Sequence, residues 1–118
     1  MSCWGPANPR YLHVMKWVTP RPRLVAMSHV LRQRGQVVPA SELAAALRAR
    51  SVSLLWDEAQ GLSNVPINFH ELGCDYYSLC GHKWLLSPEG TGALLIRKKR
   101  IDSTRSFMDG SPCRGGDA

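Results

Sequence analysis

The sequence has no long hydrophobic run. Its longest apolar stretches, such as Val52 to Trp56 and Ala93 to Ile96, fall far short of the roughly 20 residues that a transmembrane helix needs. The first 25 residues contain four basic side chains and no uninterrupted apolar core, so we expect no secretory signal. The sequence therefore predicts a cytoplasmic protein that does not associate with membranes.

Acidic residues and cysteines are also few. Nine Asp and Glu stand against 15 Lys and Arg, which gives a formal net charge of +6. The positive charge is spread in pairs along the chain and no nucleic-acid-binding motif accompanies it, so we expect no nucleic-acid partner. A salt-sensitive interaction with a polyanion is the third-ranked alternative. The four cysteines, without an export signal, predict reduced thiols rather than disulfides.

The 118 residues suit one small domain or a piece of a larger one. Residues 1–20 show no consistent period and contain several prolines, which predicts an irregular segment. Residues 21–100 hold the regular apolar pattern. Residues 101–118 lose that pattern and fill with Gly, Ser, Asp and Pro, which predicts a disordered tail.

Apolar runs of strand length alternate with helical patterns in the middle of the chain. The clearest helix follows Pro39, and Ser41 is suited to cap its first turn. Strands that alternate with helices and read as continuous apolar runs are typical of a parallel α/β sheet. The expected strands are 24–30, 51–56, 75–79 and 93–96, with a weak helical turn at 68–72.

Two polar clusters follow neighbouring strands of this predicted sheet. They are Asp57-Glu58-Ala59-Gln60 and Cys80-Gly81-His82-Lys83. Open α/β sheets bind ligands outside the carboxyl ends of their strands. An aldehyde cofactor such as pyridoxal phosphate needs a lysine, an acid for its ring nitrogen, and donors for its phenolate and phosphate. Lys83, Asp57, Gln60 and His82 supply these groups, although each alone is typical of a turn, a cap or a solvated surface.

A zinc site is the alternative for the second cluster. His70, Cys74, Cys80 and His82 lie within 13 residues, and histidine and cysteine are zinc ligands. Their spacing is not a paired CxxC or HxxxH pattern, so we expect no metal.

The segment from Pro22 to Lys98 resembles the cofactor-binding core of the class V aminotransferases, which include cysteine desulfurases and isopenicillin N epimerase-like proteins. The resemblance rests on PRLVAMSHV, GQVVP, LLWDEAQG and VPINFHELGCDYYSLCGHKWLLSPEGTGALLIRK. It implies a partial three-layer, mostly parallel sheet of the fold type I large domain, with pyridoxal 5'-phosphate as cofactor, an amino acid as substrate and a homodimer as the working form. The implied roles are Lys83 for the Schiff base and for moving protons, Asp57 for the pyridinium nitrogen, Ala59 for one ring face, Gln60 for the O3′ oxygen and His82 for the phosphate.

Several positions depart from the family pattern. Arg32 replaces the usual asparagine after the SHV-type strand, and Cys80 replaces a serine that holds the phosphate. Glu58 stands where many relatives have a smaller residue, while Trp84 and the LLSPEG run favour the epimerase-like members. Parts of the family pattern upstream and downstream are missing, so we expect a fragment of the large domain that is weakly active or inactive alone. The alternative function is a catalytically inactive remnant or interaction protein that retains the site motif.

Overall fold

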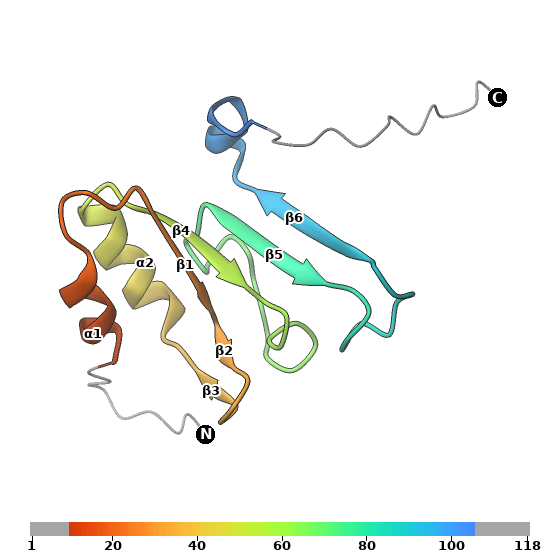
Figure 1. The fold of residues 1–118 in the computed structure, drawn as a ribbon. Helices are drawn as coiled ribbons and strands as arrows, with labels where there is room; N and C mark the ends of the chain where they lie inside the picture. The colour runs from red at the N-terminus through yellow and green to blue at the C-terminus, as the bar shows by residue number, and fades with distance from the viewer. Residues whose placement is uncertain (1–9, 106–118) are drawn as a thin grey trace.

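The computed structural model describes residues 10–105. Its centre is a four-stranded sheet in the order β1-β4-β5-β6 (Figure 1). The strands β1, β4 and β5 run parallel, and β6 is antiparallel to β5. The predicted mostly parallel α/β sheet is therefore confirmed. The strands are Leu24–Ser28 (β1), Ser53–Asp57 (β4), Tyr76–Cys80 (β5) and Gly92–Ile96 (β6).

A small hairpin follows β1. Its strands, Val30–Leu31 (β2) and Gln36–Val37 (β3), pair antiparallel. The turn between them contains Gly35 at a φ of +60°, a left-handed conformation that glycine adopts without steric cost. The expected strand over 24–30 is thus split in two at His29.

The helix α2 (Ala40–Ala49) packs on the sheet and forms the core with it. Leu43 and Leu47 of the helix are fully buried, one turn apart as helical spacing requires, and they join Leu54 and Trp56 of β4 in one cluster. Complete burial of such a side chain contributes about 2 kcal/mol. The predicted Ser41 cap is wrong. Pro39 is the N-cap without a side-chain bond, and the Ser41 hydroxyl donates to the Glu42 carboxylate at 3.0 Å.

The first helix, α1 (Arg10–Trp17), corrects the expectation that residues 1–20 are irregular. It lies beside α2 (Figure 1), and its Val14 and Met15 pack against the core. The Arg50 guanidinium, just after α2, donates to the carbonyls of Met15 and Val18 at 3.1 and 2.9 Å. A cation at these carbonyls satisfies groups that a helix C-terminus leaves unpaired.

A 3-10 helix, η1 (Lys98–Ser103), follows β6. The first three residues of the predicted tail are therefore ordered, while residues 106–118 lie outside the described residues. No helix within residues 10–105 is long and apolar enough to cross a membrane.

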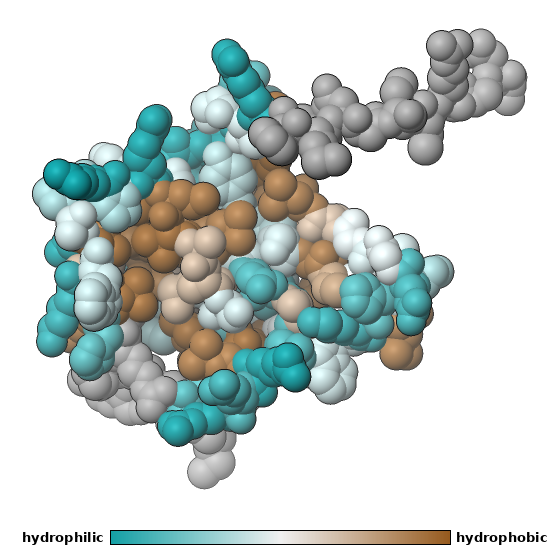
Figure 2. All heavy atoms as spheres, viewed as in Figure 1, coloured by the Kyte–Doolittle hydropathy of each residue, from teal (hydrophilic) through white to brown (hydrophobic). Residues whose placement is uncertain are grey.

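The sheet is covered unevenly. Alternate residues of β1 and β4 join α1 and α2 in the core, so both helices pack on one face, and residues 10–105 place no helix on the other. We call β1, β4, α1 and α2 the helix-covered half, and residues 81–96, which include β6, the open half. Four of the five β6 residues are exposed. Figure 2 accordingly shows hydrophobic residues reaching the surface in separate places.

Candidate active site

The carboxyl ends of the three parallel strands meet at one edge of the sheet. Asp57, the last residue of β4, is paired with Ser28 of β1 on one side and Ser78 of β5 on the other. His82 and Lys83 follow the end of β5 by two and three residues. The structure therefore places both predicted clusters at the same edge, where open α/β sheets bind ligands.

Asp57 is exposed, and a turn holds its carboxylate. The backbone N–H of Ala59 donates to Asp57 Oδ1 at 3.0 Å, an Asx-type bond that Asp commonly makes two residues along the chain. Within the described part of the chain, the second carboxylate oxygen has no partner. Asp57 thus presents an oriented negative charge beside the backbone of Ala59.

The next residue points the opposite way. Because side chains alternate along a strand, Glu58 turns into the interior, where it is 1% exposed. Its Oε1 lies 2.7 Å from Nδ1 of His29, an ion-pair distance without the direction of a hydrogen bond. The His29 ring also packs on Trp56, with 5.2 Å between centroids. A Cβ at Gly61 would collide with the Glu58 carboxylate, so this turn requires glycine.

Gln60 is tied to the second cluster. The indole Nε1–H of Trp84 donates to Gln60 Oε1 at 3.0 Å, which joins the β4 turn to the loop after β5. The Asn64 side-chain amide donates to the Gln60 backbone carbonyl at 2.9 Å. Both the side chain and the backbone of Gln60 are therefore held.

The loop after β5 carries His82 and Lys83. The loop closes on itself, since the Gly81 N–H donates to Thr91 O at 2.8 Å and the Ser87 N–H donates to Gly81 O at 3.0 Å. A Cβ at Gly81 would lie 2.5 Å from Thr91 Oγ1, so the close approach requires glycine. Lys83 is exposed, and its ammonium makes no hydrogen bond or ion pair within residues 10–105. In particular, Lys83 and Asp57 form no direct hydrogen bond or ion pair with each other in this part of the chain.

The thiol of Cys80 faces the His82 ring. Cys80 Sγ lies 3.3 Å from Nδ1 and 3.4 Å from Nε2 of His82. A thiol is a weak donor, so this contact leaves the imidazole available to a stronger partner. His82 is exposed, two residues after the carboxyl end of β5.

An open hollow of about 290 Å³ lies beside Gln60. Apolar side chains of the β2–β3 hairpin and Trp84 form its walls, and Arg32 adds a positive charge. This size is at the lower end for small-ligand pockets. Arg32 thus lines the same hollow as Gln60, at the position where the resembled family usually has an asparagine.

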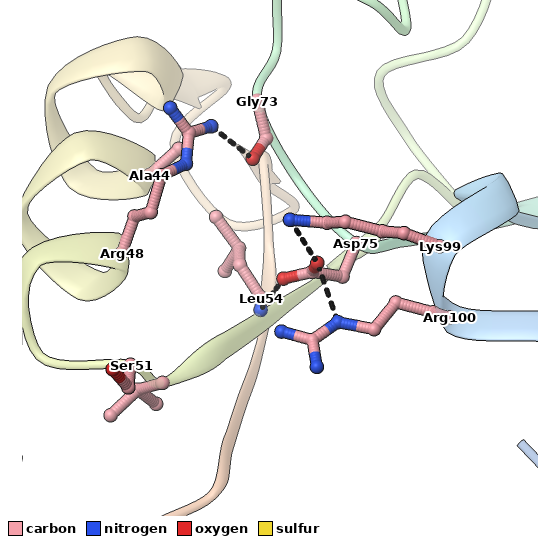
Figure 3. Close-up of a pocket in the computed structure, with 9 residues that line it drawn as sticks. Ala44, Arg48, Ser51, Leu54, Gly73, Asp75, Lys99 and Arg100 are labelled. Carbon is pink, nitrogen blue, oxygen red and sulfur yellow. Dashed lines mark hydrogen bonds and ion pairs between the residues drawn. The ribbon is translucent and has the colours of Figure 1, made fainter. Parts of the chain in front are cut away.

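A second, smaller cavity lies at the opposite end of the strands, where Asp75 precedes β5 (Figure 3). The Asp75 carboxylate accepts from the Arg100 Nε–H at 2.9 Å and from the Leu54 N–H at 3.3 Å, and Lys99 Nζ is 3.6 Å away. Burial alone would raise the pKa of Asp75, but the Arg100 hydrogen bond, the Leu54 hydrogen bond and the nearby charges lower it. These contacts tie η1 to the sheet, so we interpret this cavity as structural.

The cysteines differ in environment. Cys74 is fully buried, and burial raises the pKa of its thiol to about 11. Cys80 is half-buried at the site edge. Within residues 10–105, no three His, Cys, Asp or Glu side chains form a group that could hold a metal ion.

Comparison with known proteins identifies the family to which this chain belongs. The family model "Aminotransferase class-V" matches residues 8–114. The chain belongs to the class-V aminotransferase family. This family uses pyridoxal 5'-phosphate, and the matched segment corresponds to part of its large domain.

Three relatives illustrate the match. Isopenicillin N epimerase of Streptomyces clavuligerus is 37% identical over 83 residues, which are 70% of this chain and 21% of that protein. A probable cysteine desulfurase of Xylella fastidiosa (strain Temecula1) is 34% identical over 99 residues, or 84% of this chain and 23% of that protein. The cystine C-S lyase C-DES, solved with its product cysteine persulfide, superposes with a TM-score of 0.74 at 35% identity, covering 79% of this chain and 26% of that one.

The chain therefore spans about a quarter of the length of these relatives. A mutant of C-DES, with a TM-score of 0.73 at 34% identity over 78% of this chain and 25% of that one, carries glycine covalently linked to its pyridoxal phosphate cofactor. The resemblance stated from the sequence is thus confirmed at the level of family, fold and cofactor class.

Two contacts of the site were missed by sequence reasoning. Trp84 bonds to Gln60 across 24 positions, and His29 pairs with the buried Glu58. For Trp84 the only signal was its place directly after Lys83. For Glu58 the signal was a charged residue directly after an apolar strand, where the resemblance implies that many relatives have a smaller residue.

Proposed function

We propose that this chain holds pyridoxal 5'-phosphate at the carboxyl ends of β4 and β5 and serves pyridoxal-phosphate chemistry on an amino acid. The observation that supports this most directly is Asp57, an exposed carboxylate at the end of a parallel strand with one oxygen fixed by the Ala59 amide. Its free oxygen suits the protonated nitrogen of a pyridine ring. When bound, the cofactor withdraws electrons from the Cα of an amino acid.

The donor set of the site fits such a group. The Gln60 side-chain nitrogen and the Lys83 ammonium have no partner within residues 10–105, so both are available to a ligand. In this proposal Asp57 binds the ring nitrogen, Ala59 packs on one ring face, Gln60 donates to O3′ and His82 holds the phosphate. Lys83 would hold the cofactor through its amine and would hold or move a proton at Cα of the amino acid.

The proposal is tested by adding pyridoxal phosphate to the 118-residue chain, followed by borohydride reduction and peptide mapping. We expect a visible absorbance band and one modified peptide containing Lys83. Lys83→Ala should abolish this product, whereas Lys98→Ala, which removes an exposed lysine outside the site, should not. Labels scattered over surface lysines would refute the assignment.

The role of Asp57 requires a different readout. Asp57→Asn keeps the shape of the side chain and removes its charge, so some Lys83 adduct should remain. Exchange of the Cα proton of an added amino acid with solvent deuterium should fall at least ten-fold, because the neutral amide no longer stabilises the protonated ring nitrogen. Unchanged exchange in an active chain would contradict the role.

A second candidate is a non-catalytic protein that retains the site motif. The exposure of β6, with Leu94 and Leu95 both open to solvent, favours association with further polypeptide. The homodimer implied by the family would place a second copy near the site. Light scattering with and without pyridoxal phosphate separates these cases, since a dimer that forms only with the cofactor supports the catalytic proposal.

A further inference from the structure

We propose that Trp84 is a positioning residue, which fixes the amide of Gln60 so that its NH₂ group, and not its carbonyl, faces the cofactor oxygen. This inference rests on the proposed function, because it deepens the role assigned to Gln60. It starts from one contact, the 3.0 Å hydrogen bond from Trp84 Nε1 to Gln60 Oε1.

The chemistry of the two groups decides the orientation. An indole N–H only donates, whereas a glutamine amide has an accepting oxygen and a donating nitrogen of nearly equal size. Trp84 therefore selects the oxygen of Gln60. The NH₂ group is then directed away from Trp84 with two donors, and it has no partner among residues 10–105.

The backbone of Gln60 is fixed independently. The Asn64 side chain donates to the Gln60 carbonyl at 2.9 Å, and the Ala59 amide just before it is bound to Asp57. The remaining freedom at this residue is rotation about its side-chain bonds. The Trp84 hydrogen bond holds the amide oxygen and so restricts this rotation before a ligand arrives.

The orientation matters because the ligand group is an anion. The O3′ oxygen of the bound cofactor is a phenolate, which accepts hydrogen bonds and does not donate them. A Gln60 amide turned by 180° would present its own lone pairs to that phenolate and repel it. Trp84 also directly follows Lys83, so one short segment supplies the amine that binds the cofactor and the donor that orients its second contact.

Cofactor affinity in a double-mutant cycle provides the test. Trp84→Phe keeps the ring and removes the N–H, and Gln60→Leu removes the amide. We expect the dissociation constant for pyridoxal phosphate to rise about ten-fold in Gln60→Leu and about three-fold in Trp84→Phe. The double variant should equal Gln60→Leu, because Trp84 acts through Gln60.

Trp17→Phe is the matched control, since Trp17 is 82% exposed on α1. It should leave the affinity unchanged. Wild-type affinity in Trp84→Phe would overturn the inference. A double variant about thirty-fold weaker than wild type would also overturn it, because it would show that the two residues act independently.

A second measurement separates this inference from the proposed function. In the cofactor-free chain, the nuclear magnetic resonance signal of the Trp84 indole N–H should shift and lose protection from hydrogen exchange in Gln60→Leu. If the wild-type chain forms no Lys83 adduct, the proposed function fails for this chain. The indole signal then tests by itself whether Trp84 orients Gln60. A shift then supports the orientation of Gln60, and an unchanged signal overturns it.

Discussion

The strands β4 and β6 have the same length and similar apolar sequences, but they occupy different environments. In β4, Leu54 and Trp56 are buried beneath α2. In β6, Leu94 and Leu95 are exposed although both lie in a hydrogen-bonded strand. Apolar strands of the same length can thus be either covered or exposed, and composition alone does not decide which. The site spans this difference, with Asp57 on the helix-covered half and Lys83 on the open half.

Matched truncations in the two strands should sharpen this contrast most. Leu54→Ala should lower the free energy of unfolding by about 2–5 kcal/mol, because it leaves a cavity under α2. Leu94→Ala removes the same atoms from an exposed position and should cost less than about 0.5 kcal/mol. Urea denaturation measures both. Equal losses would show that β6 is covered in solution.

The turn after β4 offers the next largest effect. Gly61→Ala should cost about 1–3 kcal/mol, because its Cβ would meet the Glu58 carboxylate and Val30. In a Glu58→Ala background the same change should cost less, because only the 3.2 Å approach to Val30 Cγ2 remains. Thermal unfolding of the four variants gives the cycle. An equal loss of stability in both backgrounds would show that the Glu58 carboxylate is not the cause.

Asp75 joins β4 to η1, because it accepts from the Leu54 N–H and pairs with Arg100 and Lys99, and its effect should depend on pH. Its pKa is lower in the folded chain than the ordinary 3.8, so its stabilisation is complete above that value and is lost as the pH falls through the folded pKa. Asp75→Asn should cost about 1 kcal/mol at pH 7. The difference in unfolding free energy between the two proteins should narrow as the pH falls below 3.8. A difference that does not depend on pH would contradict the ion-pair account.

The last and smallest expected effect is a difference in reactivity between two cysteine thiols. In a Cys3→Ser and Cys113→Ser background, alkylation at pH 7.5 should be at least ten-fold faster at Cys80 than at Cys74. Cys74 is buried and its thiol pKa is raised to about 11, so little reactive thiolate is accessible. Mass spectrometry of the labelled peptides measures the rates, and equal labelling would mean that the core around Cys74 opens readily.

Much of this arrangement could be predicted from the sequence. Apolar runs placed β4, β5 and β6 within two residues of their ends, and the helix after Pro39 was expected. The helix α1 was missed because its two turns lie between prolines and its stability comes from contacts with the core and from Arg50, 32 positions beyond Val18. Periodicity within a short segment contains no such information.

The site divides in the same way. Motif spacing predicted that Asp57 and Lys83 follow neighbouring strands, because chain order determines where strand ends meet. It could not predict the contact of Trp84 with Gln60 or of His29 with Glu58, since both depend on how turns fold back. The exposure of β6 was equally hidden, because an apolar strand has the same sequence pattern whether it is covered or not.

Hydrogen exchange of the 118-residue chain, with and without pyridoxal phosphate, tests the central claim most directly. This claim is that the helix-covered half is folded with or without the cofactor, and that the loop after β5 supplies the proposed cofactor-binding amine of Lys83. We predict that amides of residues 54–57 are protected in both states, while those of residues 81–90 gain protection only with the cofactor. Rapid exchange at residues 54–57 without cofactor, or no change at residues 81–90 with it, would contradict the account.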